Sequence, residues 1–123
     1  MRVYASMEPT LPLSQVGAYA QRIERIGYDG LRVPETVHDG LQVALLALEH
    51  TERLQVRTSV ILAFPRSPML TAYAAWDLQT FSRGRFGLGL GTQIRANIEG
   101  RYSVPWRAPV LRMREYILAL RAI

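Results

Sequence analysis

Two periodicities alternate along this chain. Four short segments rich in β-forming residues are each followed by a longer segment in which apolar residues recur at helical spacing. The strand-like segments run from Arg2 to Met7, Asp29 to Pro34, Leu54 to Ile61 and Phe86 to Thr92. The stripes of the helical segments are Leu13, Val16, Ala20, Ile23 and Gly27, then Leu41, Leu45 and Leu48, then Met69, Ala72, Tyr73 and Trp76, and finally Val110, Met113, Ile117 and Leu120. Because neighbouring parallel strands need a crossover connection, this order predicts an α/β fold with a parallel sheet.

The expected helix ends carry recognisable signals. Ser14 is placed to cap the first helix and Gly27 to end it. Ser67 followed by Pro68 is typical of the first residues of a helix, here the third one. Between the fourth strand and the last helix, which Pro109 opens, we expect an irregular, arginine-bearing loop with room for a helical turn.

The fourth strand-like segment is bulky on one face and bare on the other. Side chains alternate along a strand, so its large residues share one face and its glycines the other: Phe86, Leu88 and Leu90 against Gly87, Gly89 and Gly91. Glycine weakens a strand, so this pattern indicates that other side chains or a ligand approach the bare face closely. Such a strand suits the wall of a small parallel barrel. The pattern does not match the dinucleotide-binding fingerprint, because Ile94 stands where the next glycine is required.

Composition narrows the function classes. With 49% apolar and 20% charged residues, the chain is globular. It has no cysteine, which excludes disulfides and thiolate chemistry, and its only imidazoles, His38 and His50, are too few to suggest a metal or haem site. The net charge of +5 comes from scattered arginines, whereas nucleic-acid binding favours basic clusters beside stacking aromatics. Neither a signal-peptide core nor a membrane-length apolar run occurs, so we expect a cytoplasmic protein that binds no nucleic acid and no membrane.

The length of the chain indicates whether its four strand–helix units form a whole barrel or a part of one. A TIM (β/α)8 barrel takes about 250 residues, so the 123 residues here correspond to about half of one. The alternation by itself fits a doubly wound sheet as well. We expect residues 1–123 to be the N-terminal half of a TIM barrel, with the C-terminal half absent. Such a half exposes open edge strands, so two copies could pair as a homodimer.

Three stretches together resemble the bacterial luciferase-like superfamily. They are the loop from Glu35 to Gly40, the sequence Arg66-Ser67-Pro68, and the stretch from Leu78 to Thr92, in the order and at the spacing of that family. The chain is most similar to the branch that uses the deazaflavin coenzyme F420, and further similarity to that branch lies in Val104 to Trp106, Pro109, and Arg114 to Tyr116. Members that use FMN share the signature of the fourth strand.

The resemblance implies an enzyme that binds a flavin-like ring at the C-terminal ends of its strands, where barrel active sites lie. Its expected activity is that of an F420-dependent oxidoreductase, which passes hydride between the deazaflavin and a small organic substrate. An FMN-dependent monooxygenase is one alternative, and a non-catalytic half-barrel that binds nothing is another. In such enzymes the cofactor carries the redox chemistry, and the protein orients it and moves protons. The phosphate-gripping loops of later strands lie outside this chain, so we expect the chain alone to be inactive.

The resemblance also implies roles for residues after the second strand. Glu35 matches an acid that contacts the cofactor and takes part in catalysis. Thr36, also expected to contact the cofactor, stands where the family usually has a catalytic His, and His38 is the candidate to replace that His as proton donor. Without the resemblance, Glu35 is equally well a solvated loop acid or a helix cap, and His38 an exposed or capping loop residue.

Two further groups of cofactor-binding residues follow from the resemblance. Ser59 and Val60 match a bulge with a non-proline cis peptide that backs the deazaflavin ring. The positions that line the cofactor site after the fourth strand are Gly91, Thr92 and Gln93. Some relatives carry a catalytic Glu just beyond, where this chain has Ile94 instead.

Overall fold

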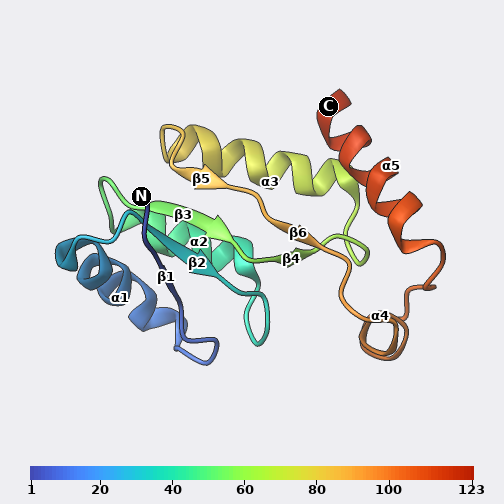
Figure 1. Ribbon diagram of the computed structural model, residues 1–123, viewed down its shortest axis with the longest axis horizontal. Coiled ribbons are helices and arrows are strands. Elements are labelled where there is room, and N and C mark those ends of the chain that lie inside the picture. The colour runs from blue at the N-terminus through green and yellow to red at the C-terminus, as the bar shows by residue number, and fades with distance from the viewer.

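The computed structural model describes residues 1–123 and has helices packed against parallel strands (Figure 1). In chain order the elements are β1 (Tyr4–Ser6), α1 (Leu13–Ile26), β2 (Gly30–Val33), α2 (Gly40–Glu49), β3 (Gln55–Thr58), β4 (Ile61–Leu62), α3 (Pro68–Phe81), β5 (Phe86–Gly87), β6 (Leu90–Gly91), α4 (Arg95–Tyr102) and α5 (Pro109–Ala122). One sheet has the order β1-β2-β3-β5, a smaller one pairs β4 with β6, and every pairing is parallel. The predicted α/β fold with a parallel sheet is confirmed.

β3 and β4 are two parts of one strand path, and so are β5 and β6. A cis peptide between Ser59 and Val60 lies in the first interruption, and Gly89 lies in the second. The two interruptions face each other: the N–H of Gly89 donates to the Thr58 hydroxyl at 2.7 Å, and that hydroxyl donates to the Gly89 carbonyl at 3.0 Å. The first interruption, with its cis peptide, agrees with the bulge that the family resemblance implies at Ser59 and Val60. The second interruption was not predicted, and at it the Thr58 hydroxyl takes hydrogen bonds that a regular ladder gives to the backbone.

Close packing between strands accounts for the bare glycine face of β5 and β6. A Cβ on Gly87 would lie 2.8 Å from Cγ of Arg57, and a Cβ on Gly91 would collide with the side chain of Val60. Both obstacles belong to the neighbouring strand path. Of the two causes expected from the sequence, side chains of the protein itself take up this face.

α1, α2 and the larger sheet enclose the main apolar core, which we call the first cluster. Its 14 buried residues include Val16, Ala20 and Ile23 of α1, Val43, Ala44, Ala47 and Leu48 of α2, and Leu31, Val33, Val56 and Phe86 of the strands. α1 buries Val16, Ala20 and Ile23 of the predicted stripe, whereas Leu13 is exposed, and so is Gly27, which follows the helix. The stripe predicted for α2 is partly wrong, because the helix turns Val43 and Ala44 towards the sheet and leaves Leu45 exposed.

α1 and α2 approach each other closely at Gly17. A Cβ at this position would lie 2.6 Å from Cγ of His50, the residue that ends α2. The imidazole of His50 is oriented by a hydrogen bond of 2.8 Å between its Nδ1 and the Leu46 carbonyl. The missing side chain at Gly17 therefore makes the space that the His50 ring occupies.

One carboxylate fastens α1 to the loop that enters β3. Glu24 accepts hydrogen bonds from the backbone N–H groups of Arg53 at 2.6 Å, Leu54 at 2.8 Å and Glu52 at 3.1 Å. Burial by itself would raise the pKa of Glu24, but the hydrogen bonds from these three N–H groups outweigh it and hold the pKa below its ordinary value. The ionised form of Glu24 is thus stabilised by folding.

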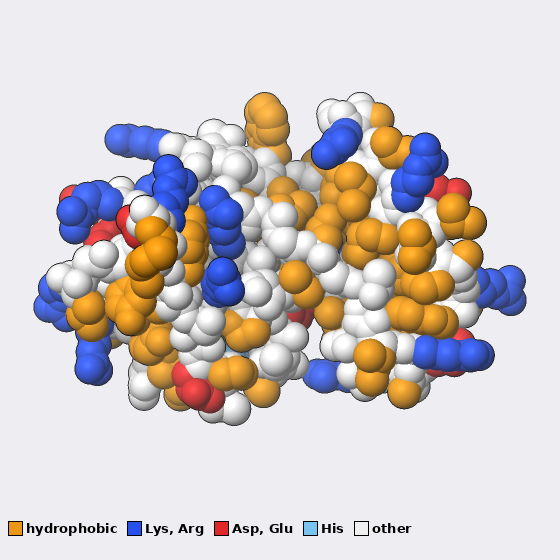
Figure 2. Space-filling view, viewed as in Figure 1, with side chains coloured by type: hydrophobic (Ala, Val, Ile, Leu, Met, Phe, Trp, Pro, Cys, Tyr) orange, Lys and Arg blue, Asp and Glu red, His pale blue; other side chains and the backbone are white.

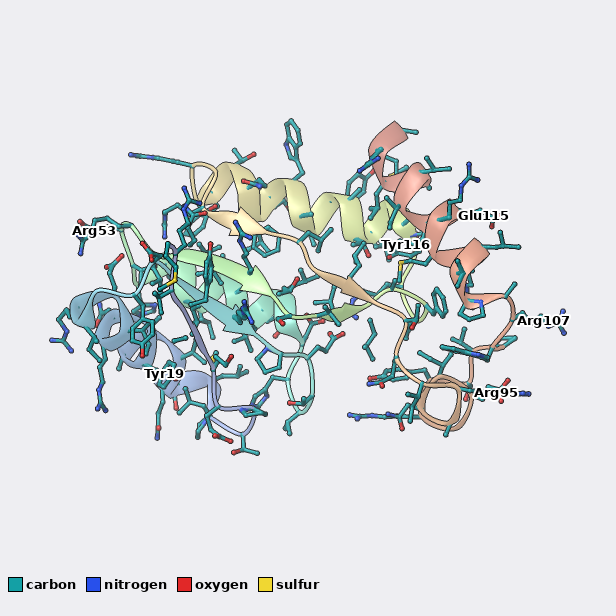
Figure 3. All side chains as sticks on the ribbon, viewed as in Figure 1. Tyr19, Arg53, Arg95, Arg107, Glu115 and Tyr116 are labelled. Atoms are coloured by element: carbon teal, nitrogen blue, oxygen red, sulfur yellow. The ribbon has the colours of Figure 1, made fainter.

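α3, α4 and α5 enclose a smaller apolar core, which we call the second cluster and whose buried members are Ala63, Phe64, Ile98 and Tyr116. The hydroxyl of Tyr116 on α5 lies 2.6 Å from the hydroxyl of Thr71 on α3, and Tyr116 points towards α3 in Figure 3. Arg112 lies over the Phe64 ring, 4.4 Å from its centroid, and donates to the Phe64 carbonyl at 3.1 Å. Polar groups therefore contribute directly to the closure of this cluster.

The inner face predicted for α3 is wrong. Met69, Tyr73 and Trp76 are 44%, 60% and 74% exposed, whereas Thr71 and Leu78 are buried. The helix carries apolar residues on more than one face, and their periodicity alone does not tell which face meets the sheet.

The helix ends and the C-terminal part agree with the predictions only in part. Gly27 ends α1 with a left-handed φ of 99°, as predicted, but Ser14 does not cap this helix, which begins earlier, after Pro12. Pro68 takes the first turn of α3, as predicted. A complete helix, α4, lies within the expected loop, and Val110 is exposed on α5 although it belongs to the predicted stripe. No helix combines the length and hydrophobicity that a bilayer crossing requires.

Candidate functional site

Three predicted site segments meet at the C-terminal ends of the strands. Glu35 follows β2, Val60 precedes β4, and Gly91 ends β6. Leu62 of β4 links them, because its N–H donates to Glu35 Oε2 at 2.7 Å and it stands opposite Gly91 in the parallel register. Parallel strands end at the same edge of a sheet, which brings loops distant in sequence together here (Figure 1).

Glu35 is held from several sides. Its side chain is 8% exposed, and it accepts hydrogen bonds from Arg66 Nη2 at 2.5 Å and Arg66 Nη1 at 2.9 Å. The same guanidinium donates to Asp39 Oδ2 at 2.9 Å and to the Leu62 carbonyl at 3.2 Å. Asp39 also caps α2 by accepting a hydrogen bond from the N–H of Leu41 at 2.8 Å. The two acids and the arginine thus join the loop after β2, the start of α2 and the segment after β4.

The charge of Arg66 is secured by this arrangement. Burial lowers the pKa of the guanidinium, but the hydrogen bonds and negative charges of Glu35 and Asp39 raise it above its ordinary value. A bidentate contact between guanidinium and carboxylate is among the strongest side-chain hydrogen-bond arrangements. Both oxygens of Glu35 are occupied, so this carboxylate is suited to fix geometry.

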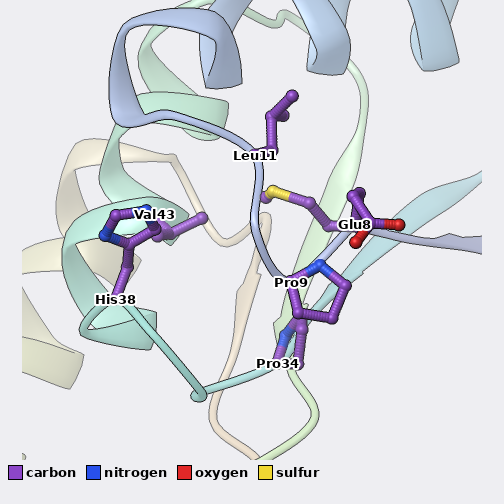
Figure 4. Close-up of a pocket in the computed structure, with 7 residues that line it drawn as sticks. Glu8, Pro9, Leu11, Pro34, His38 and Val43 are labelled. Atoms are coloured by element: carbon purple, nitrogen blue, oxygen red, sulfur yellow. The ribbon is translucent and has the colours of Figure 1, made fainter.

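Thr36 and His38 lie beside this group. The Thr36 carbonyl accepts a hydrogen bond from Arg101 Nη2 at 3.3 Å. His38 borders a small hollow of about 10 Å³, roughly the volume of one water, together with Met7, Glu8, Pro9, Leu11, Pro34 and Val43 (Figure 4). It also borders a shallow pocket of about 200 Å³ shared with Thr36, Arg66, Arg101 and Tyr102. Pockets that enclose drug-sized ligands hold about 300–1,000 Å³, so neither hollow alone encloses such a molecule.

The segment after β6 turns sharply. The Thr92 hydroxyl donates to the carbonyl of Gln93 at 3.0 Å, and Gln93 itself has a left-handed φ of 62°. The side-chain oxygen of Gln93 accepts a hydrogen bond from the N–H of Ile94 at 3.0 Å, just before α4 begins. Val60 packs against Gly91 and is 37% exposed, so an apolar surface remains open at this edge.

Sequence reasoning missed Arg66 and Asp39 as members of this group. Arg66 stands directly before Ser67 and Pro68, and that position draws attention to the start of a helix. The usable signal was topological: a cation that follows the third strand path must lie near an acid that follows the second, because both paths end at the same edge.

A parallel sheet with polar residues gathered at its C-terminal edge is the arrangement of the α/β barrel enzymes. The family comparison is more specific. The chain belongs to the luciferase-like monooxygenase family, whose model matches residues 2–123.

Curated relatives extend well beyond this chain. The uncharacterized protein Rv1360 of Mycobacterium tuberculosis is 51% identical over 111 residues, which make up 90% of this chain and 33% of that protein. A candidate coenzyme F420-dependent oxidoreductase of the same organism, Rv3520c, is 40% identical over 73 residues, which make up 59% of this chain and 21% of that protein. The chain therefore spans about a third of the length of the first relative.

Solved structures share the fold. The oxygenating component of 3,6-diketocamphane monooxygenase from Pseudomonas putida, determined in complex with FMN, has a TM-score of 0.84 at 14% identity. The alignment covers 98% of this chain and 39% of that one. Such neighbours are TIM-barrel enzymes, so the predicted fold class, half of a TIM barrel, is confirmed.

Proposed function

We propose that this chain forms the N-terminal part of a coenzyme F420-dependent oxidoreductase, which passes hydride between the deazaflavin and a small organic substrate. The observation that carries the proposal is the meeting of Glu35, Val60 and Gly91 at one edge of the sheet, in a chain of the luciferase-like family. The choice of F420 rests on the 40% identical relative from Mycobacterium tuberculosis.

The residues at this edge fit a flat aromatic ring. Val60 offers an open apolar surface above Gly91, which suits one face of a ring. We assign Ser59 and Val60 to back the ring, and we assign Thr36, Gly91, Thr92 and Gln93 to line its edge with polar and backbone groups. When bound, the deazaflavin supplies the hydride chemistry, and the protein supplies orientation and exclusion of water.

Glu35 and His38 take different parts in this proposal. The carboxylate of Glu35 is occupied by Arg66 and by the N–H of Leu62, so we assign it to hold the loop after β2 and the start of β4 in position. Its catalytic role stays a prediction. We assign proton donation to the imidazole of His38, which borders the same shallow pocket as Arg101 and Tyr102.

An FMN-dependent monooxygenase is the second candidate. It is favoured by the fold similarity to the FMN complex of the Pseudomonas putida enzyme. That similarity, at 14% identity, concerns the fold, and a deazaflavin and a flavin present the same kind of flat ring to Val60. A half-barrel that binds neither cofactor is the third outcome, and the experiment below separates all three.

Titration of the 123-residue chain with F420, and separately with FMN, tests the proposal through cofactor fluorescence. We expect saturable binding of F420, weakened at least about tenfold in Val60→Asp, because a carboxylate would face the ring at the apolar surface. Val110→Asp, an exposed position on α5, is the matched control and should leave binding unchanged.

Binding of FMN alone would support the monooxygenase. Binding of neither cofactor by a folded chain, with folding checked by far-UV circular dichroism, would contradict both assignments. Sedimentation of the same samples tests whether the chain forms the homodimer that we expect from its open strand edges.

A further inference from the structure

The Thr58 hydroxyl is a buried polar group to which the proposed function gives no role. Thr58 ends β3, is 3% exposed, and directly precedes Ser59 and Val60, the residues assigned to back the ring. On β3 its side chain shares the buried face of Val56, whereas the side chain of Val60 reaches the surface. Figure 2 shows apolar side chains at the surface around β4 and β6. The position of Val60 therefore depends on how the chain passes from Thr58 to β4.

One carbonyl group ties both ends of this passage. The Gly89 carbonyl accepts a hydrogen bond from the Thr58 hydroxyl at 3.0 Å and another from the N–H of Ile61 at 2.9 Å. Thr58 and Ile61 flank Ser59 and Val60, so the two residues between them form a bulge whose two ends are bound to the same oxygen atom. The bond at the Ile61 end belongs to the backbone. The bond at the Thr58 end belongs to a side chain, so a substitution can remove it.

The same hydroxyl also holds the N–H of Gly89. Its oxygen accepts a hydrogen bond from that N–H at 2.7 Å, so Thr58 is both donor and acceptor to one residue. A hydroxyl has one hydrogen to donate and two lone pairs that accept, so both bonds can form at once. Two hydrogen bonds to one residue restrict the orientation of the two strand paths as well as their distance.

Gly89 and Gly91 provide the surface on which Val60 rests. A Cβ on Gly89 would collide with the carbonyl oxygen of Thr58 and would lie 3.6 Å from Cγ1 of Val60. A Cβ on Gly91 would collide with the side chain of Val60 itself. The Thr58 hydroxyl binds the first of these glycines directly, so it determines where this surface lies relative to Val60.

We propose that Thr58 is a positioning residue, whose hydroxyl holds Ser59 and Val60 against Gly89 and Gly91 and so sets the apolar surface that faces the ring. The inference rests on the proposed function for the role of that surface. Without the hydroxyl, the N–H of Gly89 loses this acceptor and the first end of the bulge loses its tie. A misplacement of about 1 Å at a site is enough to weaken its function strongly, so this loss should be measurable in cofactor binding.

The test compares variants of the 123-residue chain by fluorescence titration with F420 and by NMR spectra of labelled valine methyl groups. Thr58→Val replaces the hydroxyl with a methyl group, and Thr58→Ser keeps the hydroxyl. The matched control is Thr51→Val. Thr51 is also buried, and its hydroxyl donates to the Ala47 carbonyl at 2.8 Å and accepts from Arg85 Nη1 at 3.1 Å. It precedes β3, so it lies at the opposite end of this strand from the site.

We expect Thr58→Val to weaken F420 binding about tenfold, as the loss of one hydrogen-bonded group would. The same variant should shift the methyl resonances of Val60 in the cofactor-free chain. Thr58→Ser should keep both the affinity and the resonances near those of the unaltered chain, and so should Thr51→Val. A hydroxyl that only stabilises the fold would leave the Val60 resonances in place, and its loss would act like the loss of the Thr51 hydroxyl.

Unchanged Val60 resonances or unchanged F420 affinity in a folded Thr58→Val chain would overturn the proposal, and so would equal losses in Thr58→Val and Thr51→Val. If far-UV circular dichroism shows that Thr58→Val does not fold, the comparison of Thr58→Ala with Thr58→Ser, which differ only by the hydroxyl, takes its place. An unaltered chain that does not bind F420 would contradict the proposed function instead. The resonances of Val60 in the cofactor-free chain would then still decide whether Thr58 positions it.

Discussion

The first and second clusters show two ways of closing a small core. The first cluster buries 14 residues between two helices and four strands, and its helices present continuous apolar faces to the sheet. The second cluster buries four residues, and its closure depends on a hydroxyl pair and on Arg112 above Phe64. Glu35 and Arg66 join the elements of the two, at the edge where the candidate site lies. Rigidity at that edge therefore depends on a few polar contacts more than on apolar area.

Of the substitutions that test this comparison, Leu31→Ala should lower the free energy of unfolding most. Leu31 is fully buried in the first cluster, and removal of such a side chain costs about 3 kcal/mol of unfolding free energy. Denaturant titration should show the same lowered midpoint by far-UV circular dichroism and by tryptophan fluorescence, in which Trp106, packed against the second cluster, reports on that region. Leu70→Ala, at an exposed position of α3, is the control and should change stability by less than about 0.5 kcal/mol. A lowered circular dichroism midpoint with unchanged fluorescence would mean that the second region is stable without the first.

Arg66→Gln should cost about 2 kcal/mol, because it leaves the carboxylate of Glu35, 8% exposed, without its cation. Measured by the same titration, the double variant with Glu35→Gln should regain part of this loss, since it removes the uncompensated charge. A double variant less stable than the single one would show that Glu35 stabilises the chain mainly through the N–H of Leu62.

Tyr116→Phe should cost about 1 kcal/mol at neutral pH, because the Thr71 hydroxyl loses its partner. Burial raises the pKa of Tyr116 above its ordinary value of 10.0, and the Thr71 hydrogen bond and the charge of Arg66 lower it by less. The folded state therefore holds the phenol proton more tightly than the unfolded state does. This contribution is present below pH 10 and is lost as the pH rises through the folded pKa.

The variant should lack that alkaline loss in unfolding titrations carried from about pH 10 upwards. Tyr73→Phe, which alters an exposed tyrosine on α3, is the control and should retain it. An unchanged alkaline limb in Tyr116→Phe would contradict the assignment of this loss of stability to the raised pKa of Tyr116.

Glu24→Gln should have the smallest effect, and at the opposite end of the pH range. The pKa of Glu24 is held below its ordinary value of 4.5, so the ionised form stabilises the fold above that pH. The contribution is lost as the pH falls through the folded pKa. We expect a flatter acid limb in Glu24→Gln than in Glu49→Gln, an exposed control on α2. Equal acid limbs would show that the backbone hydrogen bonds to Glu24 contribute nothing measurable.

Prediction from sequence succeeds here where the cause is local. Gly27 ends α1 because its left-handed φ suits glycine, and the strand–helix order determines a parallel sheet. It fails for the inner face of α3, because Trp76 and Leu78 are both apolar residues of one helix and only tertiary contacts choose between their faces.

The candidate site was likewise predictable in part, and the rest depends on tertiary contacts. Its place at the strand ends comes from topology, and its candidate residues come from the family resemblance. The pairing of Glu35 with Arg66 depends on side-chain directions that no spacing along the chain encodes. Arg32 and Arg57 are an intermediate case, because the predicted parallel order makes their strands neighbours, yet only the structure shows that the two are direct partners and that neither forms an ion pair.

The close packing of the His50 ring against Gly17 couples the evolution of these two positions. The imidazole of His50 fills the volume that a side chain at Gly17 would need, so Gly17 cannot gain a side chain while the ring stays in place. Lineages that gain a side chain at the first position should carry a smaller residue at the second, and the change at the second position should come first. Sequences with a small residue at position 50 and glycine still at position 17 should therefore be the intermediates between the two forms.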